Sequence, residues 1–215
     1  MSWDDAASSG ERTPVVRAVL IGSYGVGKTA LGRRLMDGTY DTNGGTTIGI
    51  DYFAKLCVRE NVRLNIWDTA GQERFHSVST SYYRMADVFV LVFNVKNRET
   101  FDKVPFYLEE IKKYQRDEGM PVVLVGNMAN EELGEPPHGS VPATTSSSIS
   151  RAEAEAFAMS HGLTYFETSA RTNTASVNRL FSSVALLGRS VPARSSSSGV
   201  DQPAAVPTSS FSRCC

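Results

Sequence analysis

The sequence predicts an α/β fold: a mainly parallel, doubly wound six-stranded sheet with helices on both faces. Apolar runs of strand length alternate with segments whose apolar residues recur at helical spacing, as in consecutive β-α-β units. Residues 88–95 and 121–127 are unbroken β-branched and aromatic runs, typical of central strands covered on both sides. A glycine-rich turn directly follows the first run. Ligands are therefore expected at the carboxyl ends of the strands.

The expected elements follow one another along the chain without a repeat. Strands are predicted at residues 16–22, 50–59, 62–67, 88–95, 121–127 and 164–168. Helices are predicted at residues 28–36, 101–114, 151–160 and about 173–187. The second and third strands alternate apolar with polar residues, as neighbours with one partly wet face do. The predicted helix at 101–114 carries Phe101, Val104, Leu108 and Ile111 at helical spacing.

At 215 residues, the chain is expected to form one globular domain with tails. The domain is predicted to span residues 14–187, after a disordered segment at residues 1–13. Residues 130–150 are rich in Pro, Ser, Thr and Gly and are interpreted as a flexible insert. Residues 188–215 are again rich in Ser, Ala and Pro, which predicts a disordered tail.

Charge and cysteine content argue against several classes of protein. The 22 basic and 23 acidic side chains nearly cancel, so no strong positive field favours nucleic acid as a partner. No run approaches the roughly eighteen apolar residues of a membrane span, and the opening residues lack the apolar core of a signal peptide. Three cysteines make no disulfide framework and fit a reducing cytosol.

The sharpest motif is the glycine-rich turn GSYGVGKT at residues 22–29, which fits GxxxxGK followed by Ser or Thr. Its glycines let the backbone curl so that several N–H groups point inward, and the following helix adds its positive end. Lys28 supplies a cation, and Thr29 offers a hydroxyl to Mg²⁺. The motif predicts a nucleoside triphosphate site, of unspecified base, formed by Ser23, Tyr24, Gly25, Val26, Gly27, Lys28 and Thr29.

A second motif begins at Asp68, where the third predicted strand ends, and continues through Gly71 and Gln72. A carboxylate here can hold Mg²⁺ through a water, Gly71 offers a backbone N–H to a γ-phosphate, and Gln72 can orient an attacking water. An aspartate that only caps a helix would explain Asp68 but not the residues that follow it.

Three further stretches, TTIGIDYF at 46–53, LNIWDTAGQERF at 64–75 and SYYRMA at 81–86, resemble the switch regions of Rab-type small GTPases of the Ras superfamily. The resemblance covers residues 14–187 and implies the small G-domain of the P-loop NTPases. It implies a GTPase that converts GTP to GDP and phosphate with Mg²⁺ as cofactor. In such a site no residue acts as a covalent nucleophile, and catalysis is mostly positioning and charge stabilisation.

The resemblance also assigns roles to single residues. It implies that Thr29, Thr47 and Asp68 hold the metal and that Gln72 is the catalytic residue. Thr47 would reach the γ-phosphate only in the triphosphate state, and its release on hydrolysis would be the switch. Tyr40 would lie edge-on to the base. The base-binding loop, in which a backbone N–H meets the guanine oxygen, would comprise Thr168, Ser169, Ala170 and Arg171.

The implied function is a molecular switch in vesicle traffic whose residues 48–52 are read by effectors. Exchange-factor, activating and prenyl-escort proteins are the other expected partners. Cys214 and Cys215 resemble the pair that many Rab proteins present for geranylgeranylation, and two lipid chains meet the requirement for stable membrane anchoring. The expected location is the cytoplasmic face of an intracellular membrane, with cycling through the cytosol.

The sequence departs from the family at its guanine motif, Asn-Lys-any residue-Asp, where it has Asn127, Met128, Ala129 and Asn130. An aspartate accepts both donors of guanine, whereas an asparagine sets its own NH₂ against the guanine amine and suits xanthine better. Three readings stay open. Guanine binds through Tyr40, the base-binding loop and the phosphates; or Glu131 or Glu132 supplies the missing carboxylate; or the base preference is changed or nucleotide binding is lost.

A second departure is Tyr24, where Rab proteins usually carry a small residue close to the γ-phosphate. A phenol ring there would crowd Gln72 or exclude an arginine supplied by an activating partner, which leads to the hypothesis of slow hydrolysis. The alternative function is a pseudo-GTPase or altered-base switch that acts as a non-hydrolysing recruitment module. Tyr24 and Asn130 favour this alternative, whereas Thr47, Asp68 and Gln72 argue against it.

Overall fold

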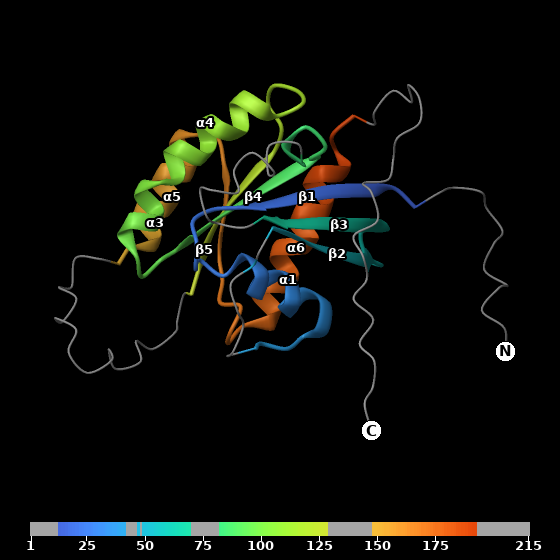
Figure 1. The fold of residues 1–215 in the computed structure, drawn as a ribbon, viewed down its shortest axis with the longest axis horizontal. Helices are drawn as coiled ribbons and strands as arrows, with labels where there is room; N and C mark the ends of the chain where they lie inside the picture. The colour runs from blue at the N-terminus through green and yellow to red at the C-terminus, as the bar shows by residue number, and fades with distance from the viewer. Residues whose placement is uncertain (1–12, 42–46, 48, 70–81, 129–147, 193–215) are drawn as a thin grey trace, which may run out of the picture.

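The computed structural model describes residues 13–41, 47, 49–69, 82–128 and 148–192. A six-stranded sheet with the order β2-β3-β1-β4-β5-β6 forms its centre (Figure 1). Neighbouring strands are parallel except for the antiparallel pair β2 and β3. The predicted mainly parallel, six-stranded sheet is therefore confirmed. The strands are β1 (Val15–Ile21), β2 (Ile50–Cys57), β3 (Val62–Thr69), β4 (Val88–Asn94), β5 (Val122–Asn127) and β6 (Thr164–Glu167).

Helices cover both faces of this sheet, as predicted (Figure 1). The first face carries α1 (Lys28–Asp37) and α6 (Thr174–Arg189), and the second carries α3 (Arg98–Asp102), α4 (Val104–Tyr114) and α5 (Arg151–Ser160). Successive residues of β4 point to opposite faces, so Val90 and Val92 join the apolar cluster under α1 and α6, while Leu91 and Phe93 join the cluster under α3 to α5. This is why the central strands read as unbroken apolar runs.

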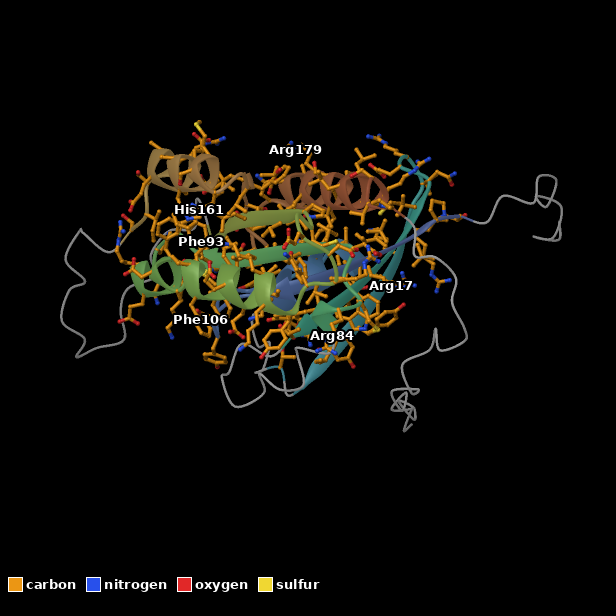
Figure 2. The ribbon with its side chains drawn as sticks, turned by 90° about the horizontal axis from the view of Figure 1, so that it is seen from above. Arg17, Arg84, Phe93, Phe106, His161 and Arg179 are labelled. Carbon is orange, nitrogen blue, oxygen red and sulfur yellow. The ribbon has the colours of Figure 1, made fainter. Side chains whose placement is uncertain are left out.

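Two phenylalanines on the second face of the sheet differ in burial. Phe93 is fully buried between the sheet and these helices, with its ring centroid 4.9 Å from that of Phe101 (Figure 2). Phe106, five residues after Phe101 in sequence, is 52% exposed. The helical spacing found in the sequence therefore identifies the buried stripe of α4 correctly, through Val104, Leu108 and Ile111.

The single helix predicted at 101–114 is wrong in detail, because the structure has two helices that meet at Lys103. The first begins three residues earlier, after Asn97, whose side chain accepts a hydrogen bond from the backbone N–H of Glu99. Pro105 lies in the first turn of α4. A proline has no N–H to continue the helical ladder and its ring crowds the preceding turn, so a helix boundary forms just before it.

The predicted tail also begins too early. Gly188 lies within α6, which continues to Arg189. A Cβ atom on Gly188 would lie 2.3 Å from Cγ1 of Val16, so glycine permits the close approach of α6 to β1. Arg189 then donates from Nη1 to the carbonyl of Glu60 at 2.9 Å, which ties the end of α6 to the β2–β3 turn.

The last two residues of the predicted insert, Ile149 and Ser150, belong to the folded domain. Residues 129–147 lie outside the described part of the chain, but Ile149 is buried in the core and Ser150 caps α5 by accepting from the N–H of Glu153. The backbone N–H of Ile149 donates to the carbonyl of Val95 at 2.7 Å, and the N–H of Val95 donates to the carbonyl of Asn127 at 3.1 Å. The chain thus returns to the sheet beside the point where it left.

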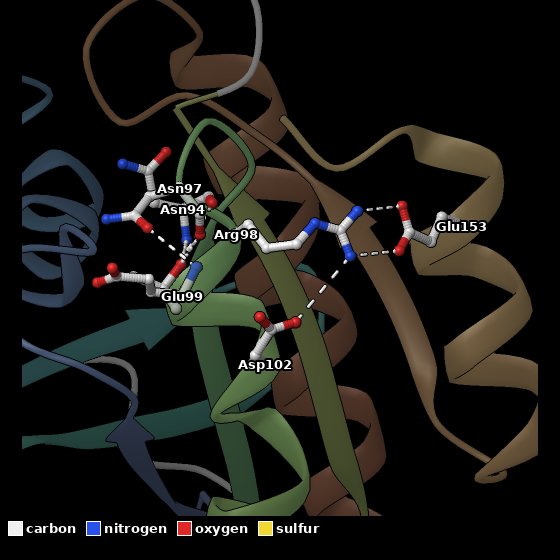
Figure 3. A network of polar contacts seen from close by, with 7 residues as sticks. Asn94, Asn97, Arg98, Glu99, Asp102 and Glu153 are labelled. Atoms are coloured by element: carbon white, nitrogen blue, oxygen red, sulfur yellow. Dashed lines mark hydrogen bonds and ion pairs between the residues drawn. The ribbon is translucent and has the colours of Figure 1, made fainter. Parts of the chain in front are cut away.

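An ion pair strengthens this return point. The guanidinium of Arg98 donates to both carboxylate oxygens of Glu153, at 2.7 and 2.8 Å, and lies 4.0 Å from Asp102 (Figure 3). The pair joins the start of α3 to the first turn of α5.

Among the described residues, no helix combines the length and apolar character that a membrane span needs.

Candidate nucleotide-binding site

The glycine-rich turn lies between β1 and α1, at the carboxyl end of the central strand, as predicted. Two of its glycines are required by close contacts. A Cβ on Gly22 would lie 2.1 Å from the carbonyl oxygen of Val92, and one on Gly27 would lie 2.3 Å from Nδ2 of Asn127. Both glycines have positive φ, at 138° and 92°. The turn is therefore packed tightly against β4 and the end of β5.

Lys28 is buried at the start of α1 and folds back over the turn. Its Nζ donates to the carbonyl oxygens of Gly22 and Ser23, at 2.8 and 3.0 Å. An ammonium group has three donors, so one of them is left for an incoming acceptor. Burial lowers the pKa of Lys28 from 10.5 to about 8, against the opposing effect of Asp68. A cation desolvated in this way favours an anionic ligand.

Thr29, Thr47 and Asp68, the three predicted metal ligands, lie together although they come from three separate segments. The hydroxyl oxygens of Thr29 and Thr47 are 2.6 Å apart, and the Thr29 hydroxyl donates to Oδ2 of Asp68. Burial raises the pKa of Asp68 from 3.8 to about 6. Among the described residues, Oδ1 of Asp68 and Oγ of Ser23 are buried without a hydrogen-bond partner.

This donor set fits Mg²⁺. All three groups are hard oxygen ligands, and the orphaned carboxylate oxygen is a site that a cation would satisfy. The described part of the chain contains no group of three or more His, Cys, Asp or Glu side chains suited to a metal. A single carboxylate with two hydroxyls is nonetheless typical of Mg²⁺ sites that are completed by phosphate oxygens and water.

Asn127 connects the glycine-rich turn to the predicted base-binding loop. Its side chain is buried, its Nδ2 donates to the carbonyl of Val26 at 2.8 Å, and its Oδ1 accepts from the N–H of Ala170 at 3.2 Å. Thr168, Ser169 and Ala170 are buried, whereas Arg171 is exposed. The structure therefore connects the predicted base-binding loop to the glycine-rich turn through one buried side chain.

Met128, at the position of the family's lysine, has an unusual backbone conformation with φ at 65°. Its terminal methyl lies 3.7 Å from the point where a Cβ of Gly27 would be, so its side chain packs against the glycine-rich turn. The thioether stem thus occupies a place beside the phosphate loop but carries no charge and no strong hydrogen-bonding group.

Arg34 is a site residue that sequence reasoning missed. It lies in α1 and donates from Nε to the carbonyl of Ala170 and from Nη2 to that of Arg171, both at 2.5 Å. Its guanidinium carbon also lies 5.9 Å from the ring centroid of Tyr40, which is half-buried against the core. The contacts span 136 and 137 positions in sequence, and no local pattern signals them.

Tyr24 and part of the predicted effector surface are exposed. Tyr24 is 58% exposed at the tip of the glycine-rich turn. On the edge strand β2, Asp51 and Tyr52 are exposed, and the Tyr52 ring lies 5.5 Å from Trp67, which in turn lies 6.2 Å from Tyr82. The remaining predicted residues lie outside the described part of the chain: Ile48, Gly71, Gln72, Asn130, Glu131, Glu132, Cys214 and Cys215.

Comparison with known proteins gives a consistent picture. Residues 17–187 match the family model described as Ras family. Human "Ras-related protein Rab-30" is 39% identical over 167 residues, which cover 77% of this chain and 75% of that protein. Mouse "Ras-related protein Rab-12" is 37% identical over 74% of this chain and 61% of its own length. "Ras-related protein RAB1BV" of Beta vulgaris is 35% identical, over 80% of this chain and 74% of that protein.

The matched region contains the sheet except the first two residues of β1, together with the glycine-rich turn, Asp68 and the proposed base-binding loop. A family match over most of the chain therefore agrees with the convergence of Lys28, Thr29, Thr47 and Asp68 in space. The chain belongs to the Ras family and is a Rab-type small GTPase, a GTP-binding switch.

Proposed function

We propose that the chain binds GTP or GDP together with Mg²⁺ and offers its switch surface to effectors when Thr47 is held by the triphosphate form. The contact between the hydroxyls of Thr29 and Thr47, at 2.6 Å, carries this proposal. It places a residue of the predicted switch region against the first turn of α1, beside Asp68. A switch element that meets the phosphate end of the site can be held or released by one phosphate group.

Each residue of the phosphate end would have its own role in phosphate binding, metal binding or positioning of water. Lys28 and the backbone N–H groups of the turn would bind the phosphates, and Lys28 would offset charge as the terminal phosphate leaves. Thr29, Thr47 and Asp68 would hold Mg²⁺, which supplies charge neutralisation between the phosphates when bound. Gln72 would orient the attacking water. The burial of Lys28 and Asp68 strengthens each of these electrostatic contacts, because nearby water is excluded.

Slow hydrolysis is the second part of the proposal, and Tyr24 is its basis. The ring stands exposed at the tip of the phosphate loop, where it would narrow the space open to Gln72 and to an arginine from an activating protein. Single-turnover hydrolysis of bound GTP tests this. Tyr24→Ser should accelerate intrinsic or stimulated hydrolysis, whereas Tyr24→Phe, which keeps the ring, should remain as slow as the natural protein.

Unchanged rates in Tyr24→Ser would contradict the role of Tyr24 and leave the switch intact. Absence of any GTP turnover in both variants would instead support the alternative function, a recruitment module that does not hydrolyse. Met128 gives that alternative its specific support, since its uncharged side chain lies where the family pattern has a lysine.

Guanine is the proposed base despite Asn130. Three observations support this base: Arg34 contacts the carbonyl of Ala170 in the proposed base-binding loop, the same guanidinium lies 5.9 Å from the ring of Tyr40, and the buried Lys28 supplies charge at the phosphate end. These groups support guanine binding without the lost aspartate, while rescue by Glu131 or Glu132 remains the second possibility on chemical grounds.

Effector, exchange-factor and activating proteins are the proposed partners of the switch surface. The exposed ring of Tyr52 on β2, which packs against the buried Trp67 of β3, supports an effector surface at this edge of the sheet, because exposed aromatic side chains favour binding. Lipid on Cys214 and Cys215, attached with the help of a prenyl-escort protein, would hold the chain on the cytoplasmic face of an intracellular membrane.

A further inference from the structure

We propose that Arg34 is a positioning residue for base recognition, which fixes both the base-binding loop and the ring of Tyr40 from helix α1. The inference rests on the proposed function, because it concerns how the base end of that site is shaped. One guanidinium meets two consecutive carbonyls of the loop, at Ala170 and Arg171, from its Nε and Nη2 atoms. This paired arrangement uses the fixed fork of the arginine side chain.

The two bonds determine where the loop's N–H groups point. In a trans peptide the C=O and the following N–H point in opposite directions. Holding the carbonyls of Ala170 and Arg171 toward α1 therefore turns the N–H groups of Arg171 and Thr172 away from it. The N–H of Ala170 is fixed separately by Asn127, and that of Thr172 by Oγ of Ser169 at 3.1 Å. Arg34 thus completes the restraint of a loop whose N–H groups are the expected donors to the base.

The same guanidinium restrains the other wall of the base site. Nη1 of Arg34 donates to the carbonyl of Gly38 at 2.7 Å, and the backbone N–H of Gly38 returns to the carbonyl of Arg34 at 3.0 Å. Gly38 ends α1, and Tyr40 follows two residues later with its ring 5.9 Å from the guanidinium carbon. A guanidinium at this distance from a tyrosine ring is attracted to it.

The departures at Met128 and Asn130 make this restraint more important in this chain. Met128 offers no charge, and Asn130 cannot accept both donors of guanine. Recognition of the base then depends on its 6-oxygen, which a backbone N–H of the base-binding loop would meet. The N–H groups of Thr168 and Ala170 already donate to Gly126 and Asn127. The N–H of Arg171, whose orientation depends on the bond from Arg34 to the Ala170 carbonyl, is therefore the proposed donor. Lysine cannot replace arginine here, because one ammonium on a flexible stem cannot span two carbonyls and lie over a ring.

Release rates of two nucleotides test the proposal. The full chain, loaded with Mg²⁺ and either ribose-labelled GDP or the same diphosphate of 2-aminopurine riboside, which lacks the 6-oxygen, is chased with unlabelled GDP. Arg34→Lys should speed GDP release by about 10- to 100-fold, as expected when charge-assisted hydrogen bonds are lost. Release of the 6-oxygen-free nucleotide should change much less, so the preference for GDP should collapse.

Arg33→Lys is the matched control. Arg33 neighbours Arg34 on α1, keeps its charge in this variant and pairs with Asp41 at the surface at 3.5 Å, so both release rates should stay unchanged. Equal acceleration of both nucleotides by Arg34→Lys, or none, would overturn the proposal while leaving the switch function intact.

A natural protein that retains neither nucleotide would instead contradict the proposed function. Amide hydrogen exchange in the ligand-free chain then decides the role of Arg34 by itself. Faster exchange at residues 170–172 in Arg34→Lys, with unchanged exchange in the core strand β4, supports the positioning role. Unchanged exchange at residues 170–172 overturns it.

Discussion

The phosphate end and the base end of the site differ in how they are built. At the phosphate end, Lys28 and Asp68 are charged groups in a buried setting, and the pKa of each is shifted against its charged form. At the base end, Asn127 and Arg34 are already hydrogen-bonded to backbone carbonyls and N–H groups. Charged groups at the phosphate end therefore lack partners that a bound ligand would supply. At the base end, hydrogen bonds within the protein already pair the polar groups and hold the loop in place.

This difference assigns affinity and selectivity to different residues. The phosphate end keeps the family pattern at Lys28, Thr29 and Asp68 and departs from it at Tyr24, while the base end departs from it at Met128 and, beyond the described residues, at Asn130. Any nucleoside diphosphate or triphosphate with Mg²⁺ would satisfy the first end. Only the second can distinguish one base from another. Substitutions at each end separately therefore test whether affinity and selectivity depend on different residues.

Removal of the phosphate-end cation should have the largest effect. Lys28→Ala is expected to weaken GDP binding by about 10²-fold or more, because a buried charge-assisted contact is lost and Asp68 is left without the cation that favours its charged form most. The measurement is equilibrium binding of labelled GDP. Lys112→Ala, which removes an exposed lysine on α4, should leave binding unchanged and serves as the control.

A change at the connection between the two ends should come next. Asn127→Ala leaves the carbonyl of Val26 and the N–H of Ala170 without a shared partner in a buried setting. We expect the free energy of unfolding to fall by about 2–4 kcal/mol, together with faster release of both GDP and the 6-oxygen-free nucleotide. Denaturant unfolding and release rates measure the two effects. A variant as stable as the natural protein would show that the two ends are independent.

Replacement of the Asp68 carboxylate by a neutral amide should have a smaller effect. It should stabilise the ligand-free protein but weaken ligand binding. The folded-state pKa of Asp68, about 6, lies above its unfolded value of 3.8, so the stability it contributes when protonated is lost as pH rises through about 6. Asp68→Asn should therefore stabilise the ligand-free protein at pH 7 and above, on the order of 1–3 kcal/mol. Unfolding of nucleotide-free protein between pH 4 and 8 measures this gain.

The same variant should also lose much of its dependence on Mg²⁺. Chelation of Mg²⁺ is expected to accelerate GDP release strongly in the natural protein and only weakly in Asp68→Asn. An equal acceleration in both proteins would contradict the assignment of Asp68 to the metal.

Much of the fold could be predicted from the sequence because periodicity reports burial directly. The alternation in β2 and β3 predicted neighbouring strands, and the two pair with each other. The unbroken runs of β4 and β5 predicted central strands, and both lie inside the sheet. The split at Lys103 was missed because the apolar spacing of Phe101, Val104 and Leu108 continues across it, whereas the break arises from the backbone of Pro105. Gly188 was taken for a tail residue because its contact with Val16 is not visible in sequence.

Some residues of the candidate site could likewise be predicted from the sequence, and one could not. Motif spacing predicted the meeting of Lys28, Thr29 and Asp68, since each lies at a defined place relative to a strand end. Arg34 could not be found like this. Its partners are carbonyl groups of a distant loop, and a carbonyl is present in every residue, so no residue type marks the interaction.

Nucleotide selection tests the central claim most directly: affinity comes from the phosphate end and a guanine preference persists at the altered base end. Purified protein is analysed for bound nucleotide, and labelled GDP is then displaced by GTP, GDP, XTP and ATP in the presence of Mg²⁺. We expect bound guanine nucleotide, strong competition by GTP and GDP, weak competition by XTP and ATP, and a larger ratio of GTP to XTP affinity in Asn130→Asp. Preference for XTP, or the absence of any bound nucleotide, would contradict the claim and show that Asn130 governs the site.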